Sequence, residues 1–486
     1  MNPVRVEALI AALRGAGLFV AAGGALPQTV DAITDDSRAV KPGSLFLAVR
    51  GSDRDGHDFL AAAASNGAAL VVLDDPRRSD LPSIVVTDTR RAAAVAAAAF
   101  HGEPASQLRL AAVTGTNGKT TTVGMLRHLL DEPGARSASI GTLGVLVGSE
   151  GAPFDGGNGL TTPGPVELQR VLRGLVDAGV RTVAMETSSH ALHQRRVDGL
   201  HFAAGVFTNL TRDHLDYHVT MDAYFAAKAM LIPLLARDGA AVVNAEDAAW
   251  NALPAAPRTI RFGSGGDVRA ERIRFSSRGS VWQLAIGLEV HDISLPLIGD
   301  FNIANALGAA GAAYAMGVSP ADIARRLSTL PQVPGRLEII AEHPTVLRDY
   351  AHTPDALERA LAAVRPFCGG RLIVVFGCGG DRDRGKRPEM GRIAESFADL
   401  AIATSDNPRT EDPERILDDI EAGMQKPHER IEDRREAIAD AMQLAGPTDV
   451  IVLAGKGHET YQIRGTVKYP FDEREIVRDL MSAAVR

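Results

Sequence analysis

The segment "AAVTGTNGKTTTVGM" combines the residue types that bind a phosphate group. Gly115 and Gly118 allow the backbone to curl so that its N–H groups surround an anion, and Lys119 adds a positive charge. Only two residues separate the first glycine from the Gly-Lys pair, so the motif is a variant of the standard phosphate loop. The apolar run before it and the helical pattern after it disfavour a chance turn. We predict nucleotide contacts from Gly115, Thr116, Asn117, Gly118, Lys119, Thr120 and Thr121.

A second group of residues has the types that bind a metal ion. Glu186 ends the apolar run "VRTVAME", where its carboxylate can face Mg²⁺ at the phosphate loop, and the Thr120 hydroxyl can reach the same ion. A polar turn further along the chain contains Asp213, His214, Asp216 and His218. Zinc requires thiolates or several imidazoles, so we expect an oxygen-preferring ion bound together with a nucleotide.

Lys228 follows this turn within "YFAAKAMLIP". A lysine on an amphipathic helix is ordinarily solvated. Small apolar neighbours can instead lower the pKa of the amine and make it nucleophilic. Such an amine can take up CO₂ and become a carbamate, which is an anionic oxygen ligand for Mg²⁺. The residues alone leave both interpretations open.

The stretch "LAIATSDNPRTEDP" places polar residues directly after an apolar run. Short apolar runs of this kind are typical of buried parallel strands, and α/β folds bind ligands just beyond the carboxyl ends of such strands. Arg409 is therefore a candidate ligand for an anion. The alternative is an ordinary Asn-Pro turn with a surface arginine.

Three α/β segments must position these residues, and a length of 486 residues fits about three domains. Short β-type runs alternate with helical patterns over residues 1–104, and "HGEPASQ" resembles a linker. We predict domains at residues 1–104, 105–334 and 335–486. The strand candidates "TVLRDYA", "RLIVVFGCG", "LAIATS" and "DVIVLAG" predict a doubly wound sheet in the third.

Composition and charge exclude several classes of protein. The net charge is −8 and there is no long basic run, which argues against nucleic-acid binding. Two cysteines form neither a disulfide framework nor a zinc site and fit a reducing cytosol. Although "GLFVAAGGALP" resembles a signal peptide, the spacing of Val6, Leu9, Ile10 and Leu13 favours an amphipathic helix followed by a short strand. No apolar stretch is long enough to insert into a membrane, so we expect a cytoplasmic protein.

Seven motifs together resemble the Mur ligases, the ATP-dependent amide-forming enzymes of peptidoglycan precursor synthesis. They are "TGTNGKTTT", "METSSHAL", "FTNLTRDHLDYH", "GDFNIANALGA", "PGRLE", "DYAHTPDAL" and "FGCGGDRDRGKRP". The resemblance covers nearly all of the chain. It implies a small N-terminal uridine-binding domain, a central ATPase domain with the phosphate loop, and a C-terminal Rossmann-like domain for the incoming amino acid.

The resemblance also implies the reaction, and it is closest to the members that add the third residue. ATP phosphorylates the D-Glu side-chain carboxylate of UDP-MurNAc-L-Ala-D-Glu, and the amine of the incoming amino acid attacks the acyl phosphate. Lys119 and two Mg²⁺ ions would supply the positive charge that brings two anions together. By resemblance, Thr120 and Glu186 bind the first ion, and His214 and a carbamate on Lys228 bind the second.

The remaining ligand contacts come from the resemblance alone. Adenine and ribose contacts fall on Asn302, Arg336 and Asp349; the residues by themselves suggest a helix cap and a linker arginine for the first two. UDP-MurNAc-dipeptide contacts fall on Ser37, Thr161, Thr162, Ser188, Gln194, Arg196 and Lys228. The family's pattern is variable around Ser52–Arg54, and this sequence differs from it there. The resemblance therefore gives only weak support for uridine contacts from these residues.

The "DNPR" motif is the form that the family associates with meso-diaminopimelate. This amino acid is lysine with a second carboxylate at its side-chain end, and a guanidinium can bind a carboxylate through two parallel hydrogen bonds. Lysine would leave the arginine unsatisfied and place an ammonium beside a cation. The predicted amino-acid contacts are Arg382, Asp406, Asn407, Pro408, Arg409, Gly455 and Glu459.

Three alternatives remain at the level of the sequence. A lysine-adding homologue would carry a different tetrapeptide, and a folylpolyglutamate synthase shares the phosphate loop and the acyl-phosphate chemistry but not the N-terminal domain. A nucleotide-binding regulator without ligase activity would need neither the His214–Lys228 pair nor the C-terminal arginines. We expect a monomer.

Overall fold

The computed structural model describes residues 3–51, 54–157, 159–276 and 278–484. Its residues form two compact units, each of which is described by itself. The first comprises the residues up to Ala270 together with Leu284–His291 and Ala304–Arg326. The second comprises Glu271–Gln283, Asp292–Ile303 and the residues from Leu327 onward.

The first unit begins with a sheet whose strand order is β2-β7-β6-β5-β4. Alternation along its strands buries both faces: Leu70 and Val72 of β6 pack under α1 and α3, whereas Val71 and Leu73 pack under α2. The predicted N-terminal helix and short strand are confirmed as α1 and β2. The elements are β1 (Val4–Arg5), α1 (Val6–Gly15), β2 (Phe19–Gly23), β3 (Thr29–Val30), β4 (Ala32–Thr34), β5 (Ser44–Leu47), α2 (Leu60–Ser65), β6 (Ala68–Leu73), β7 (Ser83–Val86) and α3 (Thr89–Phe100).

A larger sheet follows, after a short 3₁₀ helix at Pro104–Gln107. Its centre consists of parallel strands in the order β9-β12-β8-β13-β14-β15, with β10 and β11 pairing antiparallel beyond β9. Its elements are β8 (Arg109–Thr114), α4 (Lys119–Leu130), β9 (Arg136–Gly141), β10 (Gly144–Val147), β11 (Ala152–Phe154), α5 (Pro165–Asp177), β12 (Val180–Glu186), α6 (Ser189–His193), β13 (Phe202–Phe207), α7 (Leu215–His218), α8 (Met221–Ala229), β14 (Leu235–Asn244) and β15 (Arg258–Phe262).

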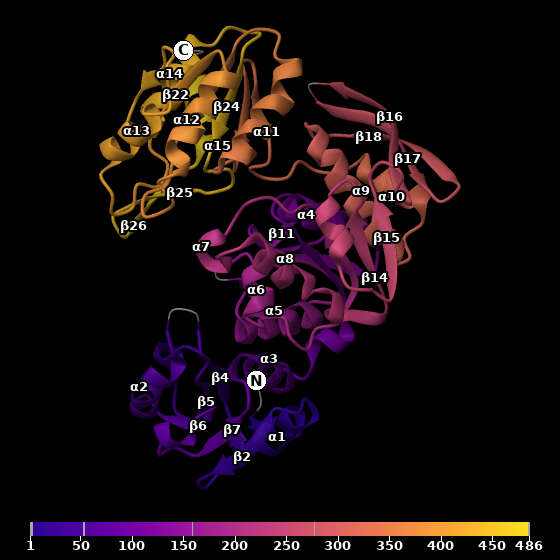
Figure 1. Ribbon diagram of the computed structural model, residues 1–486, viewed down its shortest axis with the longest axis vertical. Helices are drawn as coiled ribbons and strands as arrows, with labels where there is room; N and C mark the ends of the chain where they lie inside the picture. Colours follow the sequence, from indigo (N-terminus) through magenta and orange to yellow (C-terminus); the bar gives the residue numbers. More distant parts are fainter. Residues whose placement is uncertain (1–2, 52–53, 158, 277, 485–486) are drawn as a thin grey trace. The chain divides into compact units, whose positions relative to one another are not determined.

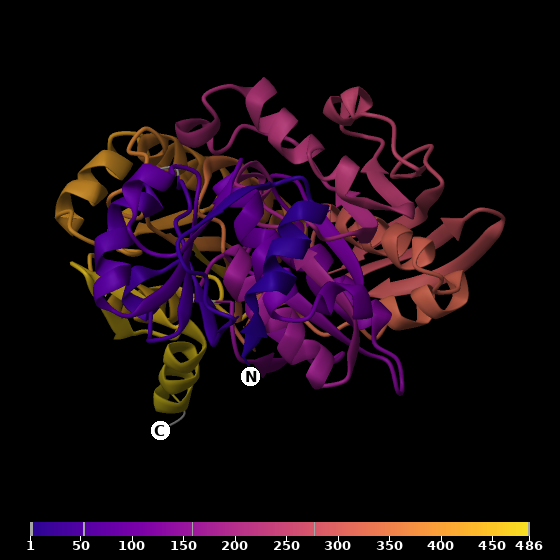
Figure 2. The same cartoon turned by 90° about the horizontal axis from the view of Figure 1, so that it is seen from below.

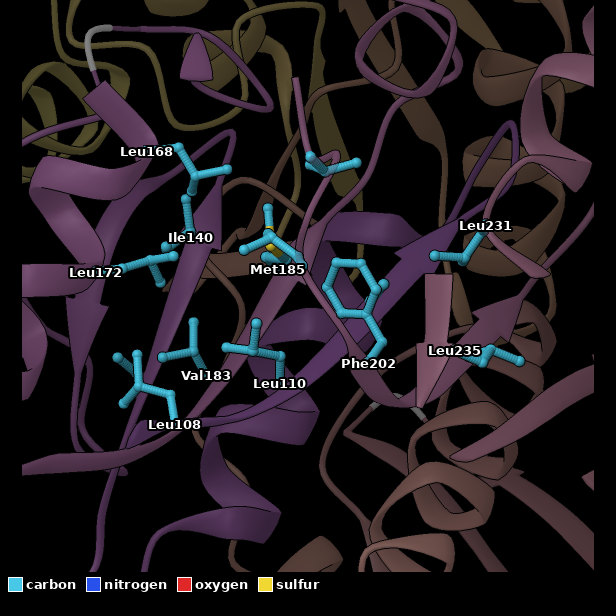
Figure 3. Packing of buried hydrophobic residues seen from close by; sticks show 14 of the residues in the cluster. Leu108, Leu110, Ile140, Leu168, Leu172, Val183, Met185, Phe202, Leu231 and Leu235 are labelled. Carbon is cyan, nitrogen blue, oxygen red and sulfur yellow. The ribbon is translucent and has the colours of Figure 1, made fainter. Parts of the chain in front are cut away.

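One face of this sheet forms a continuous apolar core. Figure 3 shows Leu110 of β8, Met185 of β12 and Phe202 of β13 side by side in this core. Leu168 and Leu172, which are four residues apart in α5, cover the same face. On the chain beyond β15 lie the elements β16 (Val268–Ser276), β17 (Gly279–Ile286), β18 (Glu289–Leu295), α9 (Asp300–Ala315) and α10 (Pro320–Leu327), which Figure 1 labels. The two units share the residues of this stretch.

The second unit contains a doubly wound sheet, as predicted, and Figure 1 labels its strands β22 and β24 among helices α11 to α15. The strand order is β19-β20-β24-β21-β22-β23. Strands β20, β21, β22, β23 and β24 are parallel to one another, and β19 pairs antiparallel with β20. Helices α11, α12 and α13 cover one face, and α14 and α15 cover the other. The described chain ends in α15, the yellow helix beside the C label in Figure 2.

The four predicted strand runs of this unit contain β20, β21, β22 and β24. The elements of the second unit have the following bounds. They are β19 (Glu338–Glu342), β20 (Thr345–Asp349), α11 (Pro354–Val364), β21 (Leu372–Phe376), α12 (Lys386–Phe397), β22 (Leu400–Ala403), α13 (Pro413–Glu421), β23 (Glu429–Arg430), α14 (Arg434–Leu444), β24 (Val450–Ala454), β25 (Tyr461–Arg464), β26 (Val467–Pro470) and α15 (Glu473–Ala484). In the described part of the chain, no helix has the length and apolar character needed to span a membrane.

Phe202 provides a test of the core beneath the large sheet. Its side chain is fully buried, so we expect Phe202→Ala to lower the free energy of unfolding by about 3–5 kcal/mol. Leu288 is fully exposed, and Leu288→Ala should change that energy by less than about 0.5 kcal/mol. Chemical denaturation of both variants checks this, and equal losses would contradict the described packing.

Candidate active site

The carboxyl ends of four parallel strands place the predicted phosphate loop and the predicted Glu186 at one edge of the large sheet, together with Thr208 and Thr142. The phosphate loop follows β8, Glu186 ends β12, Thr208 follows β13, and Thr142 lies just beyond β9. Because β8 pairs with both β12 and β13, and β12 also pairs with β9, these loops are neighbours. This edge is where α/β sheets bind ligands.

The phosphate loop requires glycine at two positions. Gly115 has φ 146°, and a Cβ there would lie 1.9 Å from Thr208 Oγ1. Gly118 has φ 84°, and a Cβ there would lie 2.2 Å from Asn305 Oδ1. Helix α4 begins at Lys119, with Thr120 and Thr121 buried in its first turn, so the helix N-terminus faces the loop. The loop thus has the conformation and the close backbone approach that phosphate binding needs.

Residues that the sequence analysis did not identify hold this loop in place. Thr208 Oγ1 donates to the Asn117 carbonyl oxygen at 2.7 Å. The Asn209 carbonyl oxygen accepts from Thr116 N at 2.7 Å, and its Oδ1 accepts from Asn117 N at 2.9 Å. The only signal in the sequence was the position of these two polar residues directly after the apolar run of β13.

Two lysine amines meet on one carbonyl oxygen of the loop. Lys228 Nζ donates to the Gly115 oxygen at 2.7 Å, and Lys119 Nζ donates to the same oxygen at 3.0 Å and to the Thr116 oxygen at 2.7 Å. Lys228 is 1% exposed and lies 4.3 Å from the centre of the Tyr224 ring. Burial, reinforced by the charge of Lys119, holds the pKa of Lys228 well below its usual range. The solvated-surface interpretation of Lys228 is therefore wrong.

Glu186 is buried and fixed by the loop after β9. Its Oε1 accepts from Thr142 N at 2.8 Å, and its Oε2 accepts from Thr142 Oγ1 at 3.2 Å. A Cβ on Gly141 would lie 2.3 Å from Oε1, so this glycine gives the carboxylate its space. Glu186 therefore presents a pre-positioned carboxylate beside the phosphate loop.

His214 belongs to a cluster of aromatic rings next to these groups. Its backbone is left-handed (φ 54°) just before α7, and its ring lies 4.8 Å from that of His190 and 6.0 Å from that of Tyr224. Partial burial lowers the pKa of His214, which favours the neutral imidazole that binds metals. Among the described residues, no group of three or more His, Cys, Asp or Glu side chains is arranged to bind a metal ion. The predicted ligands Thr120, Glu186, His214 and Lys228 would instead combine a hydroxyl, a carboxylate, an imidazole and an amine.

Four of the predicted UDP-MurNAc-dipeptide contacts form one hydrogen-bonded group centred on Thr162. Its Oγ1 donates to the Glu186 carbonyl oxygen at 2.9 Å and accepts from Ser188 N at 3.1 Å. Arg196 Nη1 donates to the Thr162 carbonyl oxygen at 2.9 Å, and Arg196 Nη2 donates to Gln194 Oε1 at 2.6 Å. The guanidinium of Arg196 is thereby fixed next to the end of β12.

The other predicted contacts for this ligand lie around that group or in the N-terminal sheet. Thr161 Oγ1 lies 3.3 Å from Thr142 Oγ1, close to Glu186. Ser37 opens a short 3₁₀ helix (Ser37–Ala39), and its carbonyl oxygen accepts from Asn66 Nδ2 at 2.9 Å. Of the stretch Ser52–Arg54, Ser52 and Asp53 lie outside the described residues.

The predicted adenine and ribose contacts lie in the second unit. Asn302 is buried in the first turn of α9, and its Nδ2 donates to the Ile298 carbonyl oxygen at 2.8 Å. The Arg336 guanidinium lies 4.8 Å from the centre of the Tyr350 ring, and Asp349 Oδ2 accepts from Leu337 N at 2.7 Å. Burial raises the pKa of Asp349 to about 6, and Arg336 acts against this shift. Arg336 and Asp349 are therefore electrostatic neighbours.

The "DNPR" segment lies immediately beyond β22, and its residues are tightly constrained. Asp406, Asn407 and Pro408 are buried, and Arg409 has a left-handed backbone (φ 53°) fixed by a hydrogen bond from its N–H to the Ile463 carbonyl oxygen at 3.1 Å. The Arg409 guanidinium donates to the Gly380 carbonyl oxygen at 2.8 Å. Arg409 is therefore not a freely moving surface side chain.

Arg382, Gly455 and Glu459 lie in loops around this segment. A Cβ on Gly379 would lie 2.8 Å from Arg409 Nη1 and 3.8 Å from Arg382 Cγ, so both arginines border the same glycine. Gly455 has φ 117°, and a Cβ there would lie 3.5 Å from Asp406 Oδ2. Glu459 Oε2 accepts from Asn407 Nδ2 at 2.9 Å. All predicted amino-acid contacts thus come from the carboxyl ends of β21, β22 and β24.

Lys456 completes this cluster, and the sequence analysis did not identify it. It is 0% exposed, and its Nζ lies 3.1 Å from Asn407 Oδ1, 3.3 Å from Glu459 Oε2 and 3.4 Å from Asp406 Oδ1. The available signal was its place between Gly455 and Gly457, directly after the apolar run of β24.

Comparisons with known proteins match this chain over most of its length. Three family models match: "Mur ligase family, catalytic domain" at residues 29–108, "Mur ligase middle domain" at 113–313 and "Mur ligase, glutamate ligase domain" at 335–457. The chain is 46% identical to the UDP-N-acetylmuramoyl-L-alanyl-D-glutamate--2,6-diaminopimelate ligase of Geobacter metallireducens, over 94% of this chain and 95% of that protein. The ligase of the same name from Gloeobacter violaceus is 45% identical over 93% of each chain.

A solved structure gives the same result. It is a UDP-N-acetylmuramoyl-L-alanyl-D-glutamate--2,6-diaminopimelate ligase that is 34% identical and aligns with a TM-score of 0.68, covering 94% of this chain and 96% of that one. The phosphate loop lies within the match to the middle-domain model, and the "DNPR" segment lies within the match to the glutamate-ligase-domain model. The chain belongs to the Mur ligase family.

Proposed function

We propose that this protein is the ligase that adds meso-diaminopimelate to UDP-MurNAc-L-Ala-D-Glu with the consumption of ATP. The observation that carries the proposal is its 46% identity, over 94% of the chain, to a ligase named for diaminopimelate and this dipeptide. The positions of Lys119, Glu186 and Arg409 support the same reaction. The product is an amide between the D-Glu side-chain carboxyl group and an amine of the amino acid, as peptidoglycan precursor synthesis requires.

The reaction has two covalent steps. The D-Glu side-chain carboxylate attacks the γ-phosphorus of ATP, the bond to the β-phosphate oxygen breaks, and ADP leaves. The amine of diaminopimelate then attacks the carbonyl carbon of the acyl phosphate. The bond from this carbon to the phosphate oxygen breaks, phosphate leaves, and the attacking nitrogen loses a proton to give the amide.

Positive charge near the phosphate loop lets the two anions approach. The Lys119 ammonium already lies against the loop carbonyls, so turning towards a γ-phosphate requires only a change of side-chain conformation. The loop N–H groups and the N-terminus of α4 add partial positive charge. Arg196, whose Nη1 donates to the Thr162 carbonyl oxygen, would bind an anionic part of the UDP-MurNAc-dipeptide. Asn302, Arg336 and Asp349 would contact the adenine and ribose of ATP.

The donor set around the loop fits two Mg²⁺ ions. Thr120 and Glu186 would bind one ion, and His214 and Lys228 would bind the other. Mg²⁺ prefers oxygen ligands, so Lys228 would serve as its carbamate. Its lowered pKa supports this assignment because only the neutral amine attacks CO₂. When bound, the ions supply positive charge between the carboxylate and the γ-phosphate.

Arg409 would distinguish diaminopimelate from lysine. Its backbone conformation and its bond to Gly380 limit where the guanidinium can lie, which lowers the entropy lost on binding a carboxylate. Arg382, next to the same glycine, would add a second cation for this carboxylate. Asp406 and Glu459 would accept hydrogen bonds from the ammonium at the same end of the ligand.

The proposed reaction can be tested with purified protein. We expect phosphate release from ATP to require both UDP-MurNAc-L-Ala-D-Glu and meso-diaminopimelate, in equal amounts with the tripeptide product. A coupled phosphate assay and mass spectrometry of the product check this. ATP hydrolysis that is independent of the amino acid, without a tripeptide product, would contradict the proposal.

Arg409→Ala tests the recognition of the second carboxylate. We expect kcat/KM for meso-diaminopimelate to fall about a hundredfold, because a desolvated charge pair is lost, while the low activity with L-lysine changes much less. Arg392→Ala is the matched control because this arginine is exposed on α12. Steady-state kinetics with both amino acids checks this. Equal losses with the two substrates would exclude a role in selecting the carboxylate.

Lys228→Ala tests the carbamate. We expect kcat to fall about a hundredfold to a thousandfold, because an anionic ligand next to the transferred phosphoryl group is lost. Lys228→Arg should be as inactive as Lys228→Ala, because a guanidinium stays protonated near neutral pH and does not form a carbamate. The wild-type enzyme should lose activity in CO₂-free buffer and regain it when bicarbonate is added. Activity that does not respond to CO₂ would refute the carbamate.

A further inference from the structure

Lys456 is a fully buried lysine that no step described above uses. It lies between Gly455 and Gly457 in the loop after β24, and its amine is surrounded by the polar atoms of the "DNPR" segment and the following turn. Such a site is costly for a lysine unless its charge is paired. Two carboxylates, those of Asp406 and Glu459, provide the pairing at 3.4 and 3.3 Å.

Lys456 engages only one oxygen of each carboxylate. Its Nζ is directed at Asp406 Oδ1 and Glu459 Oε2, and the described residues donate no hydrogen bond to Asp406 Oδ2 or Glu459 Oε1. The Asp406 and Glu459 side chains keep 9% and 16% of their surface exposed, so neither carboxylate is fully enclosed by the cluster. They are therefore available to a donor that enters from outside the cluster.

Lys456 also fixes the orientation of Asn407. The Oδ1 of this amide faces Lys456 Nζ at 3.1 Å and the Ile463 N–H at 2.9 Å, so its Nδ2 must face Glu459 Oε2. The side chains of Asp406, Asn407 and Glu459 thus have a single arrangement around the Lys456 ammonium. Removing this ammonium would leave two carboxylates close together in a site with little solvent.

We propose that Lys456 is a positioning residue that sets the amino-acid specificity of the site through its charge. The inference rests on the proposed function. Two carboxylates and one ammonium leave the buried cluster with one net negative charge, which matches one ligand ammonium. Arg409 then matches the ligand's second carboxylate. The site is consequently complementary to a side-chain end that carries both charges, as in meso-diaminopimelate, and not to the lone ammonium of lysine.

Without Lys456 the charge of the cluster would favour lysine over diaminopimelate. The cluster would carry two negative charges, which attract a lone ammonium and repel a ligand end with its own carboxylate. We expect Lys456→Met to lower kcat/KM for meso-diaminopimelate about a hundredfold, mostly through KM, and to leave that for L-lysine unchanged or higher. The KM values for ATP and for the UDP-MurNAc-dipeptide should stay as in the wild type.

The test compares four variants in steady-state kinetics with both amino acids. Lys456→Gln keeps hydrogen-bond donors but removes the charge, so it should behave as Lys456→Met does. The double variant Asp406→Asn/Lys456→Met removes one charge of each sign and should regain at least about tenfold in discrimination over Lys456→Met. Lys468→Met is the matched control because Lys468 is exposed on β26, with its Nζ 4.0 Å from the centre of the Tyr461 ring.

The outcomes separate this inference from the proposed function. A wild-type enzyme that does not use meso-diaminopimelate would remove the proposed function itself. A wild-type enzyme that uses it, together with wild-type discrimination in Lys456→Met and Lys456→Gln, would overturn the role of Lys456. Equal losses with both amino acids, or a double variant no better than Lys456→Met, would overturn it as well. If Lys456→Met does not fold, Lys456→Gln and the double variant decide the question.

Discussion

Lys119 and Lys228 converge on the carbonyl oxygen of Gly115, and the arrangement of the phosphate loop depends on this contact. Two ammonium groups on one acceptor would repel each other, and burial together with the charge of Lys119 favours the neutral form of Lys228. The loop that places this oxygen exists because Gly115 and Gly118 allow Thr208 and Asn305 to approach. The parallel order β12-β8-β13 then brings Glu186 next to the same loop. Charge, space and ligand types at this edge all favour the transfer of a phosphoryl group to a carboxylate.

The second unit also gathers polar residues at the carboxyl ends of parallel strands, but these residues form a cluster of buried charges. There the carboxyl ends of β22 and β24, on either side of β21, bring Asp406 and Lys456 together. Buried charges are costly unless they are paired in good geometry, and the cluster of Lys456, Asp406, Asn407 and Glu459 has one consistent hydrogen-bond arrangement. This arrangement holds a fixed pattern of charge, which a flexible loop could not do, and we propose that the amino acid binds there.

Local patterns in the sequence predicted the elements and the motifs at their ends. The phosphate loop, the carboxyl terminus of β12 and the "DNPR" segment each follow an apolar run, so their positions could be inferred from neighbouring residues alone. The contacts that shape these motifs could not, because they come from distant residues: Thr208 lies 91 positions from Asn117, and Lys456 lies 50 positions from Asp406. The burial of Lys228 was equally undecidable, since small apolar neighbours fit both a solvated and a buried lysine. These contacts depend on which strands lie next to each other in the sheet. Local patterns in the sequence do not specify the crossover connections that set this order.

Phosphorylation of the D-Glu carboxylate can be followed through its oxygen atoms. UDP-MurNAc-L-Ala-D-Glu labelled with ¹⁸O in the side-chain carboxylate of D-Glu is converted with unlabelled ATP and meso-diaminopimelate, and the released phosphate is analysed by mass spectrometry. If this carboxylate is phosphorylated at the loop of Gly115 and Lys119, each phosphate carries one ¹⁸O atom from the substrate. Phosphate without ¹⁸O, released together with the amide product, would show that the carboxylate is activated in another way and would exclude the acyl phosphate.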